Sequence, residues 1–193
     1  MISAILLAAG ESKRIPFENK LIKNFKNKPL INYILKSLVK SKVKKIIVVL
    51  GFEHSHIKKI ILKSKKIKLI INKNYRKGIS SSIKTGLKKI NKKDKGFMVV
   101  LSDMPFVRSI HINKIYNSIL KKDNLVHALK YKDKIGNPIG FNIKVLSKFK
   151  KIKGDIGAKY MVKRLSKNTN FIKVSTNKIF KDFDLKKDFN LFE

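Results

Sequence analysis

The first half of the chain alternates between short apolar runs and segments in which apolar residues recur every three or four positions. The runs at residues 2–7, 44–51, 67–72 and 96–103 are almost continuously apolar, which is typical of strands buried on both faces. The intervening segments predict helices at residues 29–41, 56–64 and 81–90, with Pro29 at a first helical position and Ser80 or Ser81 as an N-cap. This alternation predicts a parallel sheet with helices on both faces.

The second half is less regular but continues the alternation. Its pattern predicts helices at residues 107–120 and 157–166, and strands at residues 124–131, 134–142, 170–175 and 178–184. The sequence shows no linker, internal repeat or low-complexity block beyond its richness in lysine. We therefore expect one domain over residues 1–193.

The composition fits a folded protein of a reducing compartment. The chain has 193 residues, 43% of them hydrophobic, and contains no cysteine, which excludes disulfides and thiolate metal sites. The first apolar run is too short to span a bilayer and lacks a preceding basic region. It is followed by Gly10 and Glu11 rather than by a cleavage site. We interpret it as a strand and expect a cytoplasmic protein without a membrane anchor.

The formal net charge of +35 first suggests a nucleic-acid partner. However, the charge is spread along the whole chain, and lysine supplies nearly all of it, with arginine only at Arg14, Arg76, Arg108 and Arg164. A protein that reads bases would be expected to use more arginine for bidentate and stacking contacts. We therefore expect no nucleic-acid partner, whereas the same positive field would attract small molecules that carry phosphate.

The loop after the first strand is a candidate polyphosphate-binding loop. In an open parallel sheet, ligands bind beyond the carboxyl ends of the strands. The small residues Ala8, Ala9 and Gly10 leave the backbone open to a ligand there. Arg14 and Lys20 follow and supply cations for phosphate groups. Neither the Walker A nor the G-x-G-x-x-G pattern is present, and the alternative is an ordinary loop with surface lysines.

Two acidic segments are candidate Mg²⁺ ligands. Asp103 ends the apolar run 96–103, where a carboxylate either holds Mg²⁺ against substrate phosphates or forms an Asx turn or helix cap. Asp182 and Asp184 stand two positions apart, so both side chains lie on one face if the segment is extended. These two residues are either a second source of metal ligands or a solvated acidic turn.

The segment 74–86 follows the third strand and leads into a helix. Its Gly78 and its serines offer backbone N–H groups and hydroxyls that could contact a base or a phosphate, and the alternative is simple helix capping. The histidines at positions 54, 56, 111 and 127 lack further ligand residues nearby, so we interpret them as surface or capping residues.

Several motifs occur in the order and spacing of one enzyme family. They are LLAAGESKRI with ENKL, KGISSSIKTGL, LSDMPFV, GNPIGFN, GDIGAKYMV and DFD. From its first strand to about Asp188, the chain resembles the MobA-like nucleotidyltransferases, and among them the molybdenum cofactor cytidylyltransferases in particular. The opening loop and SDMP are shared with many sugar-phosphate and isoprenoid nucleotidyltransferases. GNPIGF and GDIGA narrow the resemblance toward enzymes that act on molybdopterin.

The resemblance implies a three-layer, Rossmann-like nucleotidyltransferase fold and a Mg²⁺-dependent enzyme. Such an enzyme would transfer CMP from CTP to the terminal phosphate of molybdenum-molybdopterin and release pyrophosphate, and a molybdenum hydroxylase would receive the product. Residues 1–105 would form the nucleotide-binding half and residues 106–193 the acceptor-binding half. Guanylyltransferase relatives carry Gly-Gly where this chain has Ala9-Gly10, so the alanine favours cytosine.

By motif position, the resemblance also implies three groups of site residues. The nucleotide would be held by Leu7, Ala8, Ala9, Gly10, Arg14, Lys20, Ser82 and Asp103. Of these, Arg14, Lys20 and Asp103 would be catalytic, and Mg²⁺ would be bound by Asp103 and Asp184. The pterin would face Gly136, Asn137, Pro138, Phe141, Gly154, Asp155, Gly157 and Ala158.

The chain departs from the family pattern in ways that concern specificity. Ile15-Pro16 stands where relatives usually carry Met-Gly, and proline cannot donate a backbone hydrogen bond. Lys159 replaces an arginine and would weaken a bidentate phosphate contact. Two other functions stay open: nucleotidyl transfer to a sugar or polyol phosphate, and a non-catalytic carrier or chaperone for the molybdenum cofactor.

Overall fold

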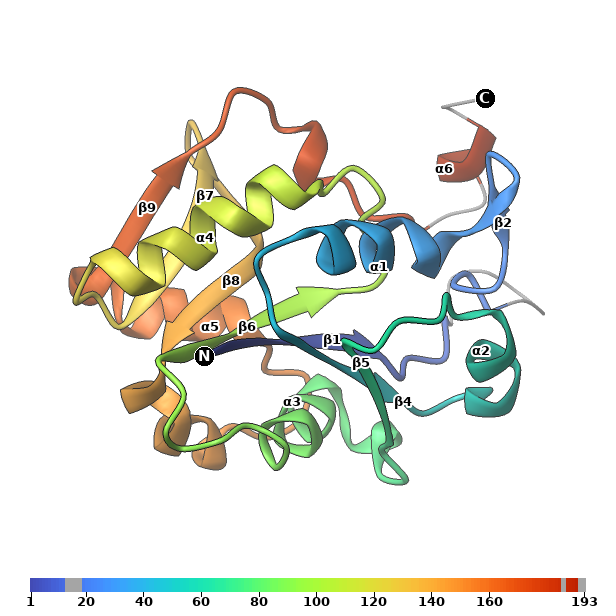
Figure 1. The fold of residues 1–193 in the computed structure, drawn as a ribbon, viewed down its shortest axis with the longest axis horizontal. Coiled ribbons are helices and arrows are strands. Elements are labelled where there is room, and N and C mark those ends of the chain that lie inside the picture. Colours follow the sequence, from blue (N-terminus) through green and yellow to red (C-terminus); the bar gives the residue numbers. More distant parts are fainter. Residues whose placement is uncertain (13–18, 185–186, 191–193) are drawn as a thin grey trace.

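The computed structural model describes residues 1–12, 19–184 and 187–190. Among these residues, seven strands form one sheet in the order β5-β4-β1-β6-β8-β7-β9 (Figure 1). β8 runs antiparallel to its neighbours β6 and β7, and the remaining pairs are parallel. The strands are β1 (Ile2–Ala8), β4 (Lys45–Leu50), β5 (Ile67–Ile71), β6 (Gly96–Leu101), β7 (Val126–Tyr131), β8 (Lys134–Asn142) and β9 (Thr169–Lys173).

Helices cover both faces of this sheet, which gives three layers (Figure 1). One face packs against α1 (Leu30–Lys40), α2 (His54–Ile60) and α4 (Ser109–Lys121). The other face packs against α3 (Ile79–Leu87), α5 (Ala158–Arg164) and the 3-10 helix η2 (Ile143–Lys151). The predicted α/β class, with a mostly parallel sheet and a Rossmann-like layer arrangement, is confirmed.

Short elements complete the described chain. They are the hairpin strands β2 (Asn24–Phe25) and β3 (Lys28–Pro29), the 3-10 turns η1 (Tyr75–Lys77), η3 (Ser166–Asn168) and η4 (Lys178–Phe180), and the helix α6 (Lys187–Asn190). None of the described helices is long and apolar enough to cross a lipid bilayer.

The central strand β1 shows why the apolar runs are continuous. Its side chains alternate between the two faces, so that Ala4 and Leu6 enter one core cluster and Ile5 and Leu7 enter the other. Both faces are covered by helices, which favours apolar side chains in both sets. The parallel register places Leu7 beside Leu101 of β6, and the carboxyl ends of β1 and β6 therefore lie at one edge of the sheet.

One predicted strand is wrong. Residues 178–184 form η4 and then a segment without regular structure. Ile179, Phe180 and Phe183 are buried, whereas Asp182 is exposed. Buried residues at this spacing fit a turn that packs one side on the core, and they do not follow the two-residue alternation of a strand.

Two predicted helix starts also need correction. α3 begins at Ile79 with Gly78 as its N-cap, and glycine has no side chain to cap it, so neither Ser80 nor Ser81 has the predicted capping role. Gly78 has a φ of +91°, a conformation that glycine adopts far more readily than other residues. Pro29 is the N-cap of α1 rather than its first helical residue.

His127 lies in the core, although the sequence suggested a surface position. Its side chain is fully buried on β7, and its Nδ1 lies 2.7 Å from Ser118 Oγ of α4. Asn170 Nδ2 of β9 donates to the same hydroxyl at 2.8 Å. Burial lowers the pKa of His127 to about 4, so the imidazole is neutral at pH 7. We call these three residues the Ser118 cluster.

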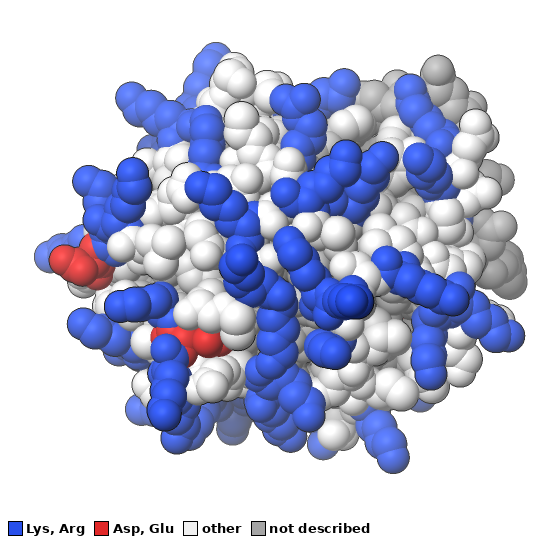
Figure 2. All heavy atoms as spheres, viewed as in Figure 1, with Lys and Arg blue, Asp and Glu red and all other residues white. Residues whose placement is uncertain are grey.

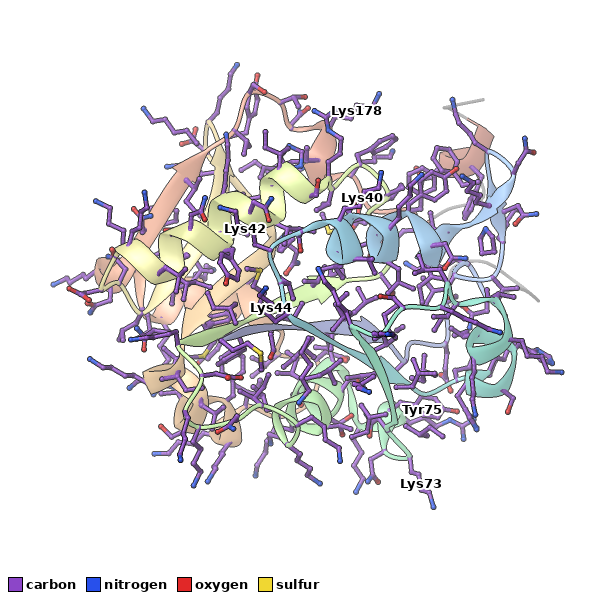
Figure 3. All side chains as sticks on the ribbon, viewed as in Figure 1. Lys40, Lys42, Lys44, Lys73, Tyr75 and Lys178 are labelled. Atoms are coloured by element: carbon purple, nitrogen blue, oxygen red, sulfur yellow. The ribbon has the colours of Figure 1, made fainter. Side chains whose placement is uncertain are left out.

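Positively charged side chains are dispersed over the face of the molecule that Figure 2 shows. Lysine and arginine side chains are spread across the whole face seen in Figure 2, and acidic side chains are few there. Lys40, Lys42 and Lys44 lie around the connection from α1 to β4 (Figure 3). The view agrees with the expectation that the charge does not form a single stripe.

Candidate active site

A cleft of about 730 Å³ opens at the carboxyl ends of β1 and β6. Its described lining residues are Leu7, Ala9, Gly10, Glu11, Ser12, Lys20, Leu21, Tyr75, Arg76, Gly78, Ile79, Ser82, Leu101, Ser102, Asp103, Asp155 and Asp184. The cleft thus gathers segments from residues 7 to 184 of the chain. It lies where a doubly wound sheet is expected to bind a ligand.

The end of β1 leaves its backbone accessible to a ligand. No atom of the residues that the structure describes lies within 4 Å of the position that a Cβ on Gly10 would take. Behind it, a Cβ on Gly51 would lie only 2.7 Å from Ala9 O, so glycine at position 51 lets the end of β4 pack closely against Ala9. Ala9 O also accepts a hydrogen bond from Phe52 N at 3.3 Å. The loop is held from behind and open on the cleft side.

Lys20 joins two carboxylates inside the cleft. Its Nζ lies 2.6 Å from Asp103 Oδ2 and 2.7 Å from Asp184 Oδ1. The three side chains are mostly buried, at 14%, 15% and 28% exposure for Lys20, Asp103 and Asp184. The sequence prediction that Lys20 and Asp103 meet at one edge of the sheet therefore agrees with the structure.

The local electrostatics favour an ammonium in this position. Burial lowers the pKa of Lys20, but Asp103 and Asp184 raise it by more, so the net pKa lies above the ordinary lysine value. For Asp103, burial raises the pKa of the carboxyl, and the neighbouring Lys20 opposes only part of that increase. The neighbouring Lys20 cation therefore favours the ionised form of Asp103 that burial disfavours.

Asp103 also keeps one oxygen for another partner. Its Oδ1 is buried and has no hydrogen-bond partner within the part of the chain that the structure describes. Buried carboxylate oxygens are normally satisfied, so an unpartnered one at a cleft points to a ligand. No cluster of three or more metal-binding side chains occurs among the described residues. Mg²⁺ sites often use only one or two carboxylates plus substrate phosphates, and Asp103 with Asp184 fits such a site.

The two carboxylates are positioned by buried neighbours. Ser102 Oγ donates to Leu7 O at 2.6 Å and ties the ends of β6 and β1 together next to Asp103. Phe183 N donates to Asp103 O at 3.0 Å. The Phe183 ring is fully buried and lies 4.9 Å from the Phe25 ring, centroid to centroid. Asp184 is therefore brought to the cleft by an aromatic anchor one residue away.

The start of α3 is already occupied by a loop from the second half. Ile79 N donates to Asp155 Oδ1 at 3.3 Å, and Ser80 N donates to Gly154 O at 3.1 Å. A Cβ on Gly78 would lie 2.4 Å from the carbonyl of Gly154, so this contact requires glycine. The backbone N–H groups that the sequence offered to a phosphate are thus used within the protein. Ser82 still lines the cleft.

Ser82 is oriented by a buried amide that sequence reasoning missed. Asn72 Nδ2 donates to Ser82 Oγ at 3.0 Å and to Ser81 Oγ at 2.8 Å. Asn72 is 3% exposed and follows β5 directly. A polar residue at the carboxyl end of a predicted strand is the signal that could have identified it.

Other lining residues were also missed. Arg76 Nε lies 2.8 Å from Glu11 Oε1, and this ion pair lines the cleft next to Tyr75. Figure 3 places Tyr75 beyond the end of β5, near Lys73. Glu11 belongs to the predicted phosphate-binding loop and Arg76 to the segment 74–86, but nothing in the sequence indicated that these two side chains would pair.

Several predicted site residues do not reach the cleft. Phe141 is fully buried and stacks on Phe97 at 5.3 Å between ring centroids, and Ala158 lies in the same core cluster. Ala8 is likewise buried, in the opposite core cluster. Phe141 and Ala158, which were expected to face the pterin, therefore lie in the core instead. The expected contact of Ala8 with the nucleotide was through its backbone and stays a prediction.

The remaining acceptor predictions are divided. Of the eight residues predicted to bind the acceptor, Asp155 is among the described residues that line the cleft. The other seven are not among them: Gly136, Asn137, Pro138, Phe141, Gly154, Gly157 and Ala158. Gly136 is required by packing, because a Cβ there would lie 2.2 Å from the Phe180 ring. Arg14 lies outside the described residues.

The fold and the cleft together define an α/β protein whose candidate site lies beyond the carboxyl ends of parallel strands. The family model for the MobA-like NTP transferase domain matches residues 4–169. The chain therefore belongs to the MobA-like NTP transferase domain family, a family of nucleotidyltransferases, as its motifs predicted.

Curated relatives are similar over most of this chain. Bifunctional protein GlmU of Clostridioides difficile is 27% identical over 154 residues, which is 79% of this chain and 31% of that protein. The 2-C-methyl-D-erythritol 4-phosphate cytidylyltransferase of Lachnoclostridium phytofermentans is 29% identical over 140 residues, 69% of this chain and 58% of that one. The matches thus span about a third to somewhat over half of these relatives.

Solved structures share the fold. Rv0371c from Mycobacterium tuberculosis superposes with a TM-score of 0.84 at 19% identity, over 99% of this chain and 96% of that one. A structure of Rv0371c with manganese gives a TM-score of 0.81 at 18% identity, over 99% and 97% of the two chains. At these identities the similarity shows the fold alone.

Proposed function

We propose that the protein is a Mg²⁺-dependent cytidylyltransferase that moves CMP from CTP to the terminal phosphate of molybdenum-molybdopterin and releases pyrophosphate. The observation that carries the nucleotidyl-transfer part is the Lys20 ion pair with Asp103 and Asp184, set in the cleft at the carboxyl ends of β1 and β6. Family membership and the cytidylyltransferase among the relatives support the reaction class and the choice of CTP.

The chemistry is an in-line displacement at the α-phosphorus of CTP. An oxygen of the acceptor phosphate forms a bond to the α-phosphorus, the bond from that phosphorus to the bridging oxygen breaks, and pyrophosphate leaves with the electron pair. The attacking phosphate is already ionised, so positioning and relief of charge repulsion are the main requirements. Mg²⁺, when bound by Asp103 and Asp184, would supply positive charge between the phosphates.

The residues of the chain itself would do the positioning. The open backbone at Gly10 would let the triphosphate lie against the end of β1. Ser82, held by Asn72, would contact the nucleotide, and Lys20 would stabilise charge that develops on the departing pyrophosphate. Arg14 would assist Lys20 in this role.

The acceptor assignment depends on the second half of the chain. In this proposal residues 1–105 bind the nucleotide and residues 106–193 bind the acceptor, with Asp155 and Asp184 as the contributions of the second half to the cleft. The motifs GNPIGF and GDIGA support molybdopterin through their resemblance to the family. The product would pass to a molybdenum hydroxylase.

A second candidate is nucleotidyl transfer to a sugar or polyol phosphate. It is favoured by the relatives, because one of them is named as a cytidylyltransferase of 2-C-methyl-D-erythritol 4-phosphate. The nucleotide half would serve either reaction, since both need a triphosphate and a metal at the same sheet edge.

An acceptor panel separates these candidates. Pyrophosphate release from Mg·CTP is measured with molybdenum-molybdopterin, with 2-C-methyl-D-erythritol 4-phosphate and with no acceptor. We expect release to depend on molybdenum-molybdopterin. Release only with the polyol phosphate would establish the second candidate. Binding of molybdopterin without any release would instead favour a non-catalytic carrier.

A further inference from the structure

The Lys20 ammonium lies between the same two carboxylates to which the proposed function assigns a divalent cation. The Lys20 Nζ contacts both of them, Asp103 Oδ2 at 2.6 Å and Asp184 Oδ1 at 2.7 Å. Two of its three N–H donors are therefore committed to carboxylates. In this arrangement Lys20 cannot also offer those donors to a phosphate.

The pair of carboxylates needs a cation. Asp103 and Asp184 are 15% and 28% exposed, and two nearby carboxylates that are poorly solvated repel each other. A positive charge between them removes this repulsion and allows both to stay ionised. Lys20 supplies that charge from the chain itself, because its own side chain is only 14% exposed and faces both acids.

We propose that Lys20 is a built-in substitute for the divalent cation, which holds Asp103 and Asp184 together until a nucleoside triphosphate arrives. The phosphates then attract the ammonium away from the carboxylates, and the divalent cation enters with the nucleotide. Free metal therefore binds weakly to the empty cleft, and metal and nucleotide bind cooperatively. This inference rests on the proposed function, because it uses the same metal ligands.

Binding of Mn²⁺ alone tests the proposal without any catalytic readout. The amount of free Mn²⁺ is followed by electron paramagnetic resonance as the metal is titrated into the wild type, Lys20→Met and a matched control. Lys66→Met is the control, because Lys66 Nζ is also held by the protein but donates to the carbonyls of Val39 and Ser41 at 2.7 and 2.9 Å.

We expect Lys20→Met to bind Mn²⁺ at least about tenfold more tightly than the wild type, in the range of ordinary coupling between two ligands of one site. Lys66→Met should bind Mn²⁺ like the wild type. An affinity for Mn²⁺ that is unchanged or lower in folded Lys20→Met would overturn the proposal. If Lys20→Met does not fold, Lys20→Gln, which keeps a hydrogen-bond donor, replaces it with the same expectation.

A double variant shows where the extra metal binds. Lys20→Met combined with Asp103→Asn should lose the added Mn²⁺ affinity, and retention of that affinity would also overturn the proposal, because the metal would then bind elsewhere. Pyrophosphate release by the wild type is independent of these titrations. If the wild type releases pyrophosphate but Lys20→Met gains no Mn²⁺ affinity, only this inference fails. If Lys20→Met gains Mn²⁺ affinity but the wild type releases no pyrophosphate with any acceptor, only the proposed reaction fails.

Discussion

Two buried polar groups in this protein differ in what surrounds them. Lys20, Asp103 and Asp184 meet at the carboxyl ends of β1 and β6, inside a cleft of about 730 Å³. The Ser118 cluster joins α4 to the sheet, because Ser118 of α4 contacts His127 of β7 and Asn170 of β9. The first group is charged and lines the cleft, whereas the second is neutral at pH 7 and does not line it.

The difference indicates which group serves a ligand. Asp103 keeps a buried oxygen without a partner among the described residues, and burial raises the pKa of its carboxyl. In the Ser118 cluster, the Ser118 hydroxyl has a hydrogen-bond partner on each of two strands. His127 Nε2 is also buried without a partner among the described residues, but unlike Asp103 it does not line the cleft. We therefore expect substitutions in the cleft to reduce activity with little loss of stability, and substitutions in the Ser118 cluster to do the opposite.

The largest expected effect is on turnover. Asp103→Asn should lower the rate of pyrophosphate release at least about 10²-fold, because the carboxylate that would hold the metal is gone. Its melting temperature should stay close to that of the wild type, because the neutral amide relieves the cost of a buried charge. Asp123→Asn, at an exposed position, is the matched control. Wild-type turnover by Asp103→Asn would remove Asp103 from the reaction.

The next effect is on stability. Ser118→Ala should reduce the free energy of unfolding by about 1–3 kcal/mol, because the buried His127 and the partly buried Asn170 lose their shared partner. Urea denaturation measures this loss, and the activity of the folded variant should equal that of the wild type. Ser175→Ala, at an exposed serine, should change neither quantity. A loss of activity in folded Ser118→Ala would show that the two regions are coupled.

The smallest effect is a dependence of stability on pH. In the folded protein burial lowers the pKa of His127 to about 4, below the ordinary value of 6.5 that applies when the chain is unfolded. Above pH 6.5 the imidazole is neutral in both states, so His127 contributes no pH dependence. As the pH falls from 6.5 toward 4, the unfolded chain takes up a proton that the folded chain does not, and stability is lost.

At pH 5 this loss should be about 1–2 kcal/mol relative to pH 7.5. It is obtained by comparing urea denaturation of the wild type with that of His127→Gln, which lacks the titrating group and should show a shallower pH dependence. His56→Gln, at an exposed histidine, should keep the wild-type pH dependence. Equal slopes for the wild type and His127→Gln would contradict the buried, neutral histidine.

The sequence predicted the cleft region well for a physical reason. Parallel strands that are apolar on both faces must have their carboxyl ends at one edge, so small residues after β1 and Asp103 after β6 had to lie close together. Lys20 could be placed with them because it follows β1 closely in the chain. Asp184 is far away in sequence. Its pairing with Asp182 made it a candidate metal ligand, but no periodicity could bring it to the cleft, and only its place in the DFD motif favoured that position.

The second half was harder to predict. The motif GNPIGF identified β8, but alternation alone does not tell which side chains a neighbouring helix or ring will cover. Gly136 accommodates the Phe180 ring, and Phe141 packs between Phe97 and Phe149. His127 was misjudged for the same reason, because its burial depends on α4 and β9, which join it only in the folded chain.

The most direct measurement is a thermal-shift titration with CTP, GTP, ATP and UTP, each with Mg²⁺, on the wild type and on Asp103→Asn. A ligand that binds only the folded state raises the melting temperature. At a concentration of about 100 times its dissociation constant, Mg·CTP should raise the melting temperature of the wild type by about 5 °C or more. The rise in the melting temperature of Asp103→Asn should be much smaller. If none of the four triphosphates raises the melting temperature of the wild type, the cleft does not bind nucleotides.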